Sequence, residues 1–211
     1  MKNILIANPK GGSGKSTIAT NLAGFFAQQD DKVILSDLDR QQSATSWLDR
    51  RPANYPLITA HQTKDKSTIK EKLVNKTQWM ITDSPGGFRD DKLSEAVKQA
   101  DCIIVPVQPS AFDMGATQDF LDILNAEKAI RKNKTFIALV GMRVNYRTHA
   151  ALKLVEFLEQ TDLPVLTYLR NAQIYVTAAE QGLSIFDMRP SQVAHDIAQW
   201  QPILDWIKET T

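Results

Sequence analysis

Short apolar runs alternate along this chain with longer segments whose apolar residues recur at helical spacing. The runs predict strands at residues 4–7, 33–35, 57–60, 79–83, 101–107, 135–141 and 165–169. The longer segments predict helices from residue 18 to about 28, and at residues 41–50, 63–75, 111–128 and 172–181. A last helical pattern begins at Ser191 and is interrupted by Pro202. Strands that alternate with helices in this way predict an α/β fold, an open, mostly parallel twisted sheet with helices on both faces.

A glycine-rich stretch joins the first predicted strand to the first predicted helix. From Asn8 to Thr17 it reads Asn-Pro-Lys-Gly-Gly-Ser-Gly-Lys-Ser-Thr. Glycines allow successive backbone N–H groups to turn toward one anion, and the N-terminus of the following helix adds a positive dipole end. Lys15 would supply a charge for the β- and γ-phosphates, and Ser16 would offer a hydroxyl to Mg²⁺. The predicted nucleotide-binding residues are Gly11, Gly12, Ser13, Gly14, Lys15, Ser16 and Thr17. The alternative is a simple Gly/Ser turn between strand and helix.

Three aspartates follow predicted strands. Asp37 and Asp39 come just after residues 33–35, and Asp83 ends the strand at residues 79–83. Because ligands of open α/β sheets bind at the carboxyl ends of the strands, we expect these carboxylates beside the phosphates, with Ser16, Asp37 and Asp83 near Mg²⁺. The alternatives are that Asp37 and Asp39 cap the next helix, and that Asp83 is one of many acids that end buried strands.

A basic block lies in the second half of the chain. Seven cations and no carboxylate occur from Lys128 to Lys153, so the overall net charge of +1 leaves the remainder net negative. Such a block is typical of a surface that binds a polyanion without sequence preference. The alternative is that its cations point in different directions around a loop, a strand end and a helix.

Composition excludes several protein classes. The single cysteine, Cys102, excludes an intramolecular disulfide framework and fits a reducing cytoplasm. No apolar run reaches membrane-spanning length, and the chain begins directly with a predicted strand, so we expect no signal peptide and a cytoplasmic protein. The tail carries Asp196, Asp205 and Glu209 against Lys208, which predicts no attraction to an anionic membrane.

The motifs together resemble the ParA/MinD superfamily of P-loop ATPases. Lys10-Gly11-Gly12-Ser13-Gly14-Lys15-Ser16 is similar to the deviant phosphate loop of that family, with Pro9 where the usual loop has glycine. Asp37-Leu38-Asp39 resembles its second signature, although Arg40 replaces the usual proline. Residues 79–83 resemble its Walker B strand, residues 84–87 its mobile switch, and residues 106–110 its Pro-Val-x-Pro-Ser segment.

The resemblance covers essentially the whole chain and implies roles for particular residues. It implies a catalytic set of Lys10, Lys15 and Asp39, in which Lys10 reaches across a homodimer to the partner's nucleotide and Asp39 orients the attacking water. It also places Arg143 or Asn145 beside adenine. The candidate DNA-binding residues are Arg143, Arg147, Lys153 and Arg170. Arg170 is included because, in the family, the basic residue after the strand at residues 165–169 lies near the DNA-facing edge of the dimer. The alternative for Arg170 is an ion pair with a local carboxylate.

We therefore expect one ATPase domain over residues 1–211, of the small ParF-like type, with no N-terminal helix-turn-helix domain. Its reaction would convert ATP and water into ADP and phosphate, with Mg²⁺, slowly when the protein is alone. The main interpretation is plasmid or chromosome partition. In it, ATP-bound dimers bind nonspecific double-stranded DNA on the nucleoid and a ParB-like or cargo-adaptor protein stimulates hydrolysis.

Three alternatives belong to other classes. The same machinery could position protein cargo such as carboxysomes or chemoreceptor clusters. A P-loop metabolic ligase of the dethiobiotin-synthetase type would need a small-substrate pocket and no DNA. A MinD-like membrane regulator is disfavoured by the acidic tail, and an iron–sulfur reductase of the nitrogenase type is excluded because it needs two bridging cysteines in each chain.

Overall fold

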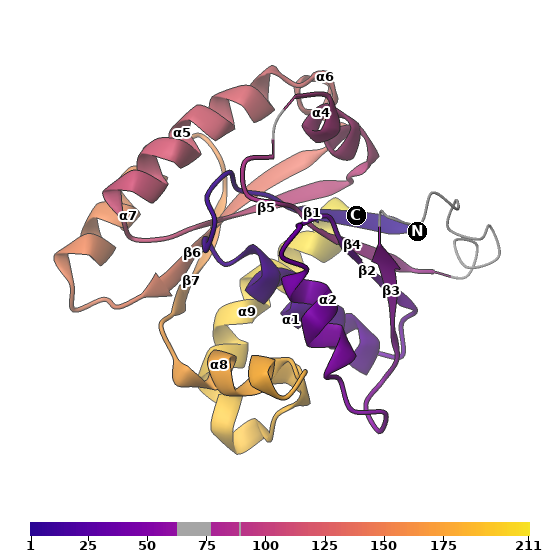
Figure 1. Cartoon of the computed structure of the whole chain (residues 1–211). Coiled ribbons are helices and arrows are strands. Elements are labelled where there is room, and N and C mark those ends of the chain that lie inside the picture. The colour runs from indigo at the N-terminus through magenta and orange to yellow at the C-terminus, as the bar shows by residue number, and fades with distance from the viewer. Residues whose placement is uncertain (63–76, 89) are drawn as a thin grey trace.

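A computed structural model describes residues 1–62, 77–88 and 90–211 of the chain. Seven strands within these ranges form one sheet in the order β3-β2-β4-β1-β5-β6-β7, and every pairing is parallel (Figure 1). The strands are β1 (Lys2–Ile6), β2 (Val33–Asp37), β3 (Ile58–Gln62), β4 (Trp79–Asp83), β5 (Cys102–Val107), β6 (Phe136–Val144) and β7 (Val165–Arg170). The predicted fold class is confirmed.

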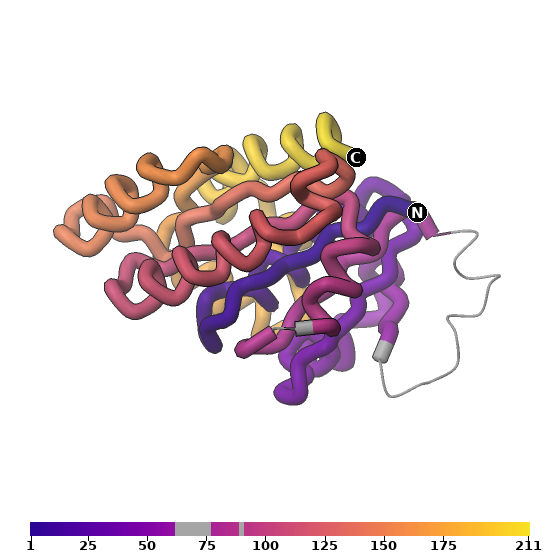
Figure 2. The backbone as a smooth tube through the Cα atoms, turned by 90° about the horizontal axis from the view of Figure 1, so that it is seen from above, coloured from indigo at the N-terminus to yellow at the C-terminus, as the bar shows by residue number. Residues whose placement is uncertain are grey.

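Helices cover both faces of the sheet (Figure 1). On one face lie α1 (Lys15–Gln28), α2 (Ser43–Asp49), α8 (Gln173–Glu180), the short 3₁₀ helix η1 (Ile185–Asp187) and α9 (Pro190–Thr210). On the other lie α4 (Asp90–Gln99), α5 (Ala111–Ala126), α6 (Lys128–Arg131) and α7 (His149–Glu159). Each layer has its own apolar core, because residues that alternate along the strands point to opposite faces. Seen from above, α9 ends close to the start of β1, so the two termini lie side by side (Figure 2).

The strand register brings the predicted motifs to one edge. Ile6, at the end of β1, lies opposite Asp83 at the end of β4, and Asp83 lies opposite Asp37 at the end of β2. The glycine-rich stretch leaves β1 at this same edge. The parallel sheet therefore assembles a site from segments that are about thirty to seventy residues apart in sequence.

Several element boundaries differ from the sequence prediction. The predicted helix at residues 111–128 ends at Ala126, because Glu127 is extended, and α6 follows as a separate turn. Strand β6 continues to Val144 through a bulge, beyond the predicted end at residue 141.

The C-terminal helix also differs from its prediction. Helix α9 passes through Pro202 without ending. Trp200, Ile203, Leu204 and Ile207 are buried on both sides of the proline, and this packing offsets the one missing backbone hydrogen bond. Helices α4 and α7 were not predicted, and the predicted helix at residues 63–75 lies outside the described residues.

Candidate functional site

The glycine-rich stretch forms a loop that curls around the Lys15 side chain. Lys15 is the first residue of α1 and is only 6% exposed. Its Nζ donates to the Lys10 carbonyl at 2.8 Å and to Ser13 Oγ at 3.4 Å. Burial lowers the Lys15 pKa, while the charges of Asp83 and Asp39 oppose that shift. A buried ammonium at a helix N-terminus, within a curled backbone, is suited to holding phosphate groups.

Two glycines give the loop its curvature. Gly12 has a φ of +79° and Gly14 a φ of +103°, values that side-chain-bearing residues rarely adopt. A Cβ on Gly14 would also lie 2.7 Å from Met142 Cε, whereas one on Gly12 would meet no atom within 4 Å. Gly14 is therefore constrained both by its backbone and by the side chain beneath it.

Asp37, the last residue of β2, and Asp39, on the β2–α2 connection, have different surroundings. Asp37 is 5% exposed, and its two oxygens accept from the backbone N–H groups of Asp39 at 3.0 Å and Thr45 at 2.9 Å. Asp39 Oδ1 accepts from Gln41 N at 3.0 Å. The Thr45 bond satisfies a backbone donor in the first turn of α2, which is the capping role that the sequence left open for Asp37.

Asp83 is a buried carboxylate that accepts no hydrogen bond of regular geometry from the described residues, although the Ser16 hydroxyl lies near it. It is 1% exposed, and among the described residues none donates to either oxygen or to the neighbouring Ser84 Oγ. Burial raises the pKa of Asp83 to about 7; the nearby Ser16 hydroxyl and Lys15 oppose the shift, and Asp37 and Asp39 add to it. The electrostatic neighbours show that Asp83 lies close to the phosphate loop and to both other aspartates.

These side chains fit a Mg²⁺ ion bound with a nucleotide. A divalent cation would compensate the unpartnered charge of Asp83, and the Ser16 hydroxyl is a suitable oxygen ligand. Within the described ranges, no three His, Cys, Asp or Glu side chains are grouped to hold a metal on their own. Mg²⁺ typically keeps several waters and bonds to phosphate oxygens, so this donor set suits a nucleotide-bound ion rather than a permanent one.

The segment after β4 lies against the phosphate loop. Gly87 N donates to the Pro9 carbonyl at 2.8 Å, and a Cβ on Gly86 would lie 3.4 Å from Gly11 N. The segment at residues 84–87, expected to act as a switch, therefore contacts the loop directly. A Cβ at Gly86 would still make an ordinary van der Waals contact, and it is the φ of +72° at Gly87 that favours glycine in this segment.

Two further residues hold the loop, Asn8 just after β1 and Gln108 just after β5, and sequence analysis gave neither of them a role. Gln108 Nε2 donates to the Gly12 carbonyl. The fully buried Asn8 donates from Nδ2 to Pro106 O at 2.9 Å and to Thr117 Oγ1 at 3.0 Å, and accepts from Lys10 N at 2.8 Å. Asn8 lies within the glycine-rich stretch and Gln108 within the segment at residues 106–110, and those positions were the available signal.

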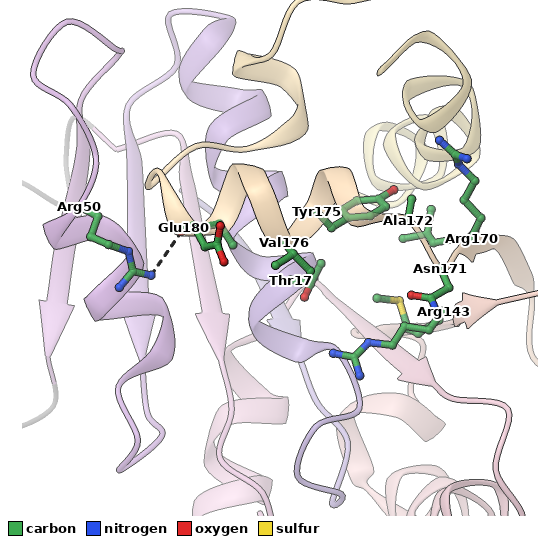
Figure 3. Close-up of a pocket in the computed structure, with 12 residues that line it drawn as sticks. Thr17, Arg50, Arg143, Arg170, Asn171, Ala172, Tyr175, Val176 and Glu180 are labelled. Carbon is green, nitrogen blue, oxygen red and sulfur yellow. Dashed lines mark hydrogen bonds between the residues drawn. The ribbon is translucent and has the colours of Figure 1, made fainter. Parts of the chain in front are cut away.

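A cavity of about 570 Å³ adjoins the loop (Figure 3). It lies between the start of α1, the ends of β6 and β7, and helix α8. Its lining residues are Thr17, Arg50, Met142, Arg143, Leu169, Arg170, Asn171, Ala172, Tyr175, Val176, Ala179 and Glu180. The cavity is large enough for a nucleoside, and it meets the phosphate loop at Thr17.

The two residues expected beside adenine are placed differently. Arg143 lines the cavity, and its φ of +51° at the β6 bulge directs its side chain toward Thr17 (Figure 3). Asn145 is not among the lining residues; its Oδ1 accepts from Arg147 N at 3.2 Å. Asn171, which follows β7, lines the cavity and was not singled out from the sequence.

The basic block is divided by β6. Its seven cations are all exposed. Lys128, Arg131, Lys132 and Lys134 precede the nine-residue strand, and Arg143, Arg147 and Lys153 follow or end it. At about 3.3 Å per residue, the strand separates the two groups by roughly 30 Å. The block therefore forms two separate groups, and only the second group, which contains the candidate DNA-binding residues Arg143, Arg147 and Lys153, lies at the edge that carries the glycine-rich loop.

Arg170 has a local ionic partner. Its Nε and Nη2 donate to the two carboxylate oxygens of Asp196, both at 2.8 Å. Asp196 lies on α9 and is fully buried. In Figure 3 the Arg170 side chain points away from Arg143 and toward α9. The local ion pair, which the sequence left open as an alternative, is present.

Comparison with known proteins agrees with this architecture. The family model described as the CobQ/CobB/MinD/ParA nucleotide binding domain matches residues 4–185. The maintenance of carboxysome distribution protein A of Halothiobacillus neapolitanus is 28% identical over 204 residues, which cover 93% of each chain.

Solved structures share the fold. Apo McdA from Cyanthece superimposes with a TM-score of 0.75 at 16% identity, covering 100% of this chain and 99% of that one. A plasmid partition protein from Borrelia burgdorferi gives 0.62 at 21% identity, covering 88% and 97%. With the strand–loop–helix site and the matched residues 4–185, these findings show that the chain belongs to the CobQ/CobB/MinD/ParA family, and so to the ParA/MinD superfamily of P-loop ATPases.

Proposed function

We propose that this protein is an ATP-driven dimerisation switch that positions a protein cargo, of the kind served by carboxysome-distribution proteins. The observation that carries the choice of cargo is the relative from Halothiobacillus neapolitanus, which matches over 93% of both chains. It favours protein cargo over the plasmid or chromosome partition that the motifs alone suggested.

The proposed reaction is hydrolysis of ATP to ADP and phosphate, with Mg²⁺. Lys15, Ser16 and the loop N–H groups would bind the phosphates, and Ser16 and Asp83 would hold the ion, with Asp37 behind them. The ion supplies charge neutralisation on the phosphates. Asp39 has one oxygen engaged by Gln41 N, and its other oxygen would orient the attacking water.

The nucleoside would occupy the cavity beside Thr17, with Arg143 and Asn171 on its walls and Asn145 outside it. Lys10 is half-buried at the start of the loop, and its side chain would reach the nucleotide of a second copy. Hydrolysis would then be slow until a cargo-adaptor protein completes the site, because one chain alone neutralises little transition-state charge.

Double-stranded DNA is the proposed track, which would place the protein on the nucleoid in the cytoplasm. Arg143, Arg147 and Lys153 are exposed at the β6–α7 end, and positions 143–155 contain no carboxylate. Three phosphate contacts in each protomer would give binding that depends on salt and not on sequence. No helix within the described residues has the length and continuous apolar character needed to traverse a bilayer.

The DNA proposal is tested by measuring binding to random-sequence duplex DNA with ATP and with ADP across a salt series. We expect binding with ATP alone, weakening steeply as salt rises. Arg147→Glu should weaken it, whereas Lys132→Glu, a matched charge reversal at the other end of β6, should not. Absence of binding in both nucleotide states would contradict the DNA track and favour a purely protein-directed switch or a metabolic ligase.

Partition of a plasmid or chromosome is the second candidate, since the fold also matches a plasmid partition protein. Deleting the gene in its host separates the two. Irregular spacing of a protein compartment with normal replicon inheritance supports cargo positioning. Loss of a replicon with normally spaced compartments supports partition by way of a ParB-like partner.

A further inference from the structure

We propose that Asn8 and Thr117 are positioning residues that fix the main chain of Lys10 for its contact with the second protomer. This inference rests on the proposed function, because it assumes that Lys10 acts across a dimer. Neither residue lines the cavity beside Thr17. Asn8 is the first residue of the glycine-rich stretch but precedes the residues predicted to bind nucleotide, and Thr117 lies on α5.

Asn8 uses its whole side-chain amide inside the protein. It is fully buried directly after Ala7, at the end of the first strand. Its Nδ2 donates to Pro106 O at 2.9 Å and to Thr117 Oγ1 at 3.0 Å, and its Oδ1 accepts from Lys10 N at 2.8 Å. A buried amide that is satisfied in this way has one orientation, because any rotation would leave donors without acceptors.

Thr117 fixes that orientation from helix α5. It is fully buried, and its hydroxyl donates to the Asp113 carbonyl at 2.8 Å in the preceding turn. The hydroxyl oxygen is therefore presented as an acceptor to Asn8 Nδ2. The hydrogen-bond chain runs from the α5 backbone through Thr117 and Asn8 to the peptide N–H of Lys10.

Lys10 is consequently held on both sides of its Cα. Its N–H donates to Asn8, and its carbonyl accepts from Lys15 Nζ at 2.8 Å. Pro9, with its fixed φ, occupies the corner between Asn8 and Lys10. These restraints set the direction in which the flexible Lys10 side chain leaves the loop, so less conformational entropy is lost when it binds across an interface.

The phosphate-binding part of the loop has other supports. Gln108 Nε2 donates to Gly12 O, within the phosphate-binding residues. Gly87 N donates to Pro9 O at 2.8 Å, and this carbonyl shares its peptide group with the Lys10 N–H, so it adds a restraint on the Lys10 main chain. Loss of the Thr117 hydroxyl should therefore disturb Lys10 more than the phosphate site. The two effects can be measured separately, as dimerisation and as nucleotide affinity.

The test is a set of variants in which Mg²⁺–ATP affinity and the ATP-dependent dimer dissociation constant are both measured. Thr117→Val removes the acceptor with little change in shape, and Asn8→Ala removes the linking amide. We expect the dimer constant of each to weaken about tenfold while ATP affinity changes less than about twofold. Thr117→Ser should restore wild-type dimerisation. Thr135→Val is the matched control, because Thr135 is another buried hydroxyl that donates to backbone carbonyls, at Val97 and Ala100.

Wild-type dimerisation of Thr117→Val would overturn the inference, as would parallel losses of ATP affinity and dimerisation. Thr117→Val carries the test if Asn8→Ala does not fold. Lys10→Ala shows whether a negative result means that the proposed role of Lys10 is wrong or that only the positioning role of Asn8 and Thr117 is wrong. If Lys10→Ala itself dimerises normally, the proposed function is wrong about Lys10; if it does not dimerise while Thr117→Val does, only the positioning role is wrong.

Discussion

Replacing Asp83 with asparagine would show how much the buried carboxylate lowers the stability of the protein when no ion is bound to it. Asp83 is 1% exposed, and its oxygens have no donor among the described residues. Burial raises its pKa from 3.8 to about 7. Asparagine has nearly the same shape and does not ionise, so Asp83→Asn should escape the cost of burying a charge.

The magnitude follows from the difference in proton binding between the folded and unfolded states. Between pH 5 and pH 7 the unfolded Asp83 is ionised and the folded one is protonated, so raising the pH favours the unfolded state. Each pH unit in this window lowers the free energy of unfolding by about 1.4 kcal/mol. The wild-type protein should therefore lose about 3 kcal/mol relative to Asp83→Asn between pH 5 and pH 8, with little further change above pH 8.

The assay is urea unfolding of both proteins at several pH values, without nucleotide and in the presence of a metal chelator. Titrating groups far from Asp83 are common to both proteins and cancel in the difference, so the difference reports on Asp83 together with its electrostatic neighbours Lys15, Asp37 and Asp39. A stability difference that is the same at pH 5 and pH 8 would refute the reasoning. With Mg²⁺–ATP the wild-type protein should become more stable than Asp83→Asn, because only the Asp83 carboxylate can balance the positive charge of the ion.

Three other variants test separate parts of the site. Asp39→Ala should lower ATP turnover by about a hundredfold and leave a persistent ATP-bound dimer, seen by phosphate release and sedimentation; normal turnover would exclude a role in orienting water. Reversing Arg147 and Lys153, which are exposed and lie outside the nucleoside cavity, to Glu should weaken DNA binding at least tenfold, measured by fluorescence anisotropy; unchanged DNA binding would place the DNA surface elsewhere. Gly14→Ala should destabilise the protein by about 1–3 kcal/mol and abolish ATP binding, because its Cβ would lie 2.7 Å from Met142 Cε at a φ of +103°. Thermal melts would measure the stability and calorimetry the ATP binding, and wild-type values in both would contradict the steric argument.

The phosphate loop and its carboxylates could be predicted because local patterns determine them. A strand, a glycine-rich stretch and a helix in succession place the loop at a strand end, and parallel register then brings Asp37 and Asp83 to the same edge. The period of the apolar positions was enough to predict the strands of the sheet and that helices cover both faces, although α4 and α7 were not predicted individually.

The parts that could not be predicted depend on contacts distant in sequence. Arg170 pairs with Asp196, which lies 26 positions further along the chain, and no local pattern indicates such a partner. Asp37 lies opposite Asp83 and also accepts two local backbone hydrogen bonds, so its capping role is present, and its place near Mg²⁺ stays a prediction. Continuity of α9 at Pro202 depends on tertiary burial, which overrides local preference.

The central claim is that ATP drives a change of oligomeric state through Lys10. The most direct measurement is the molar mass of the protein in solution with Mg²⁺–ATP and with Mg²⁺–ADP, for wild type and Lys10→Ala. We predict a dimer for wild type with ATP, a monomer with ADP, and a monomer for Lys10→Ala in both. The same mass for wild type in both nucleotides, or an ATP-bound Lys10→Ala dimer, would contradict the account.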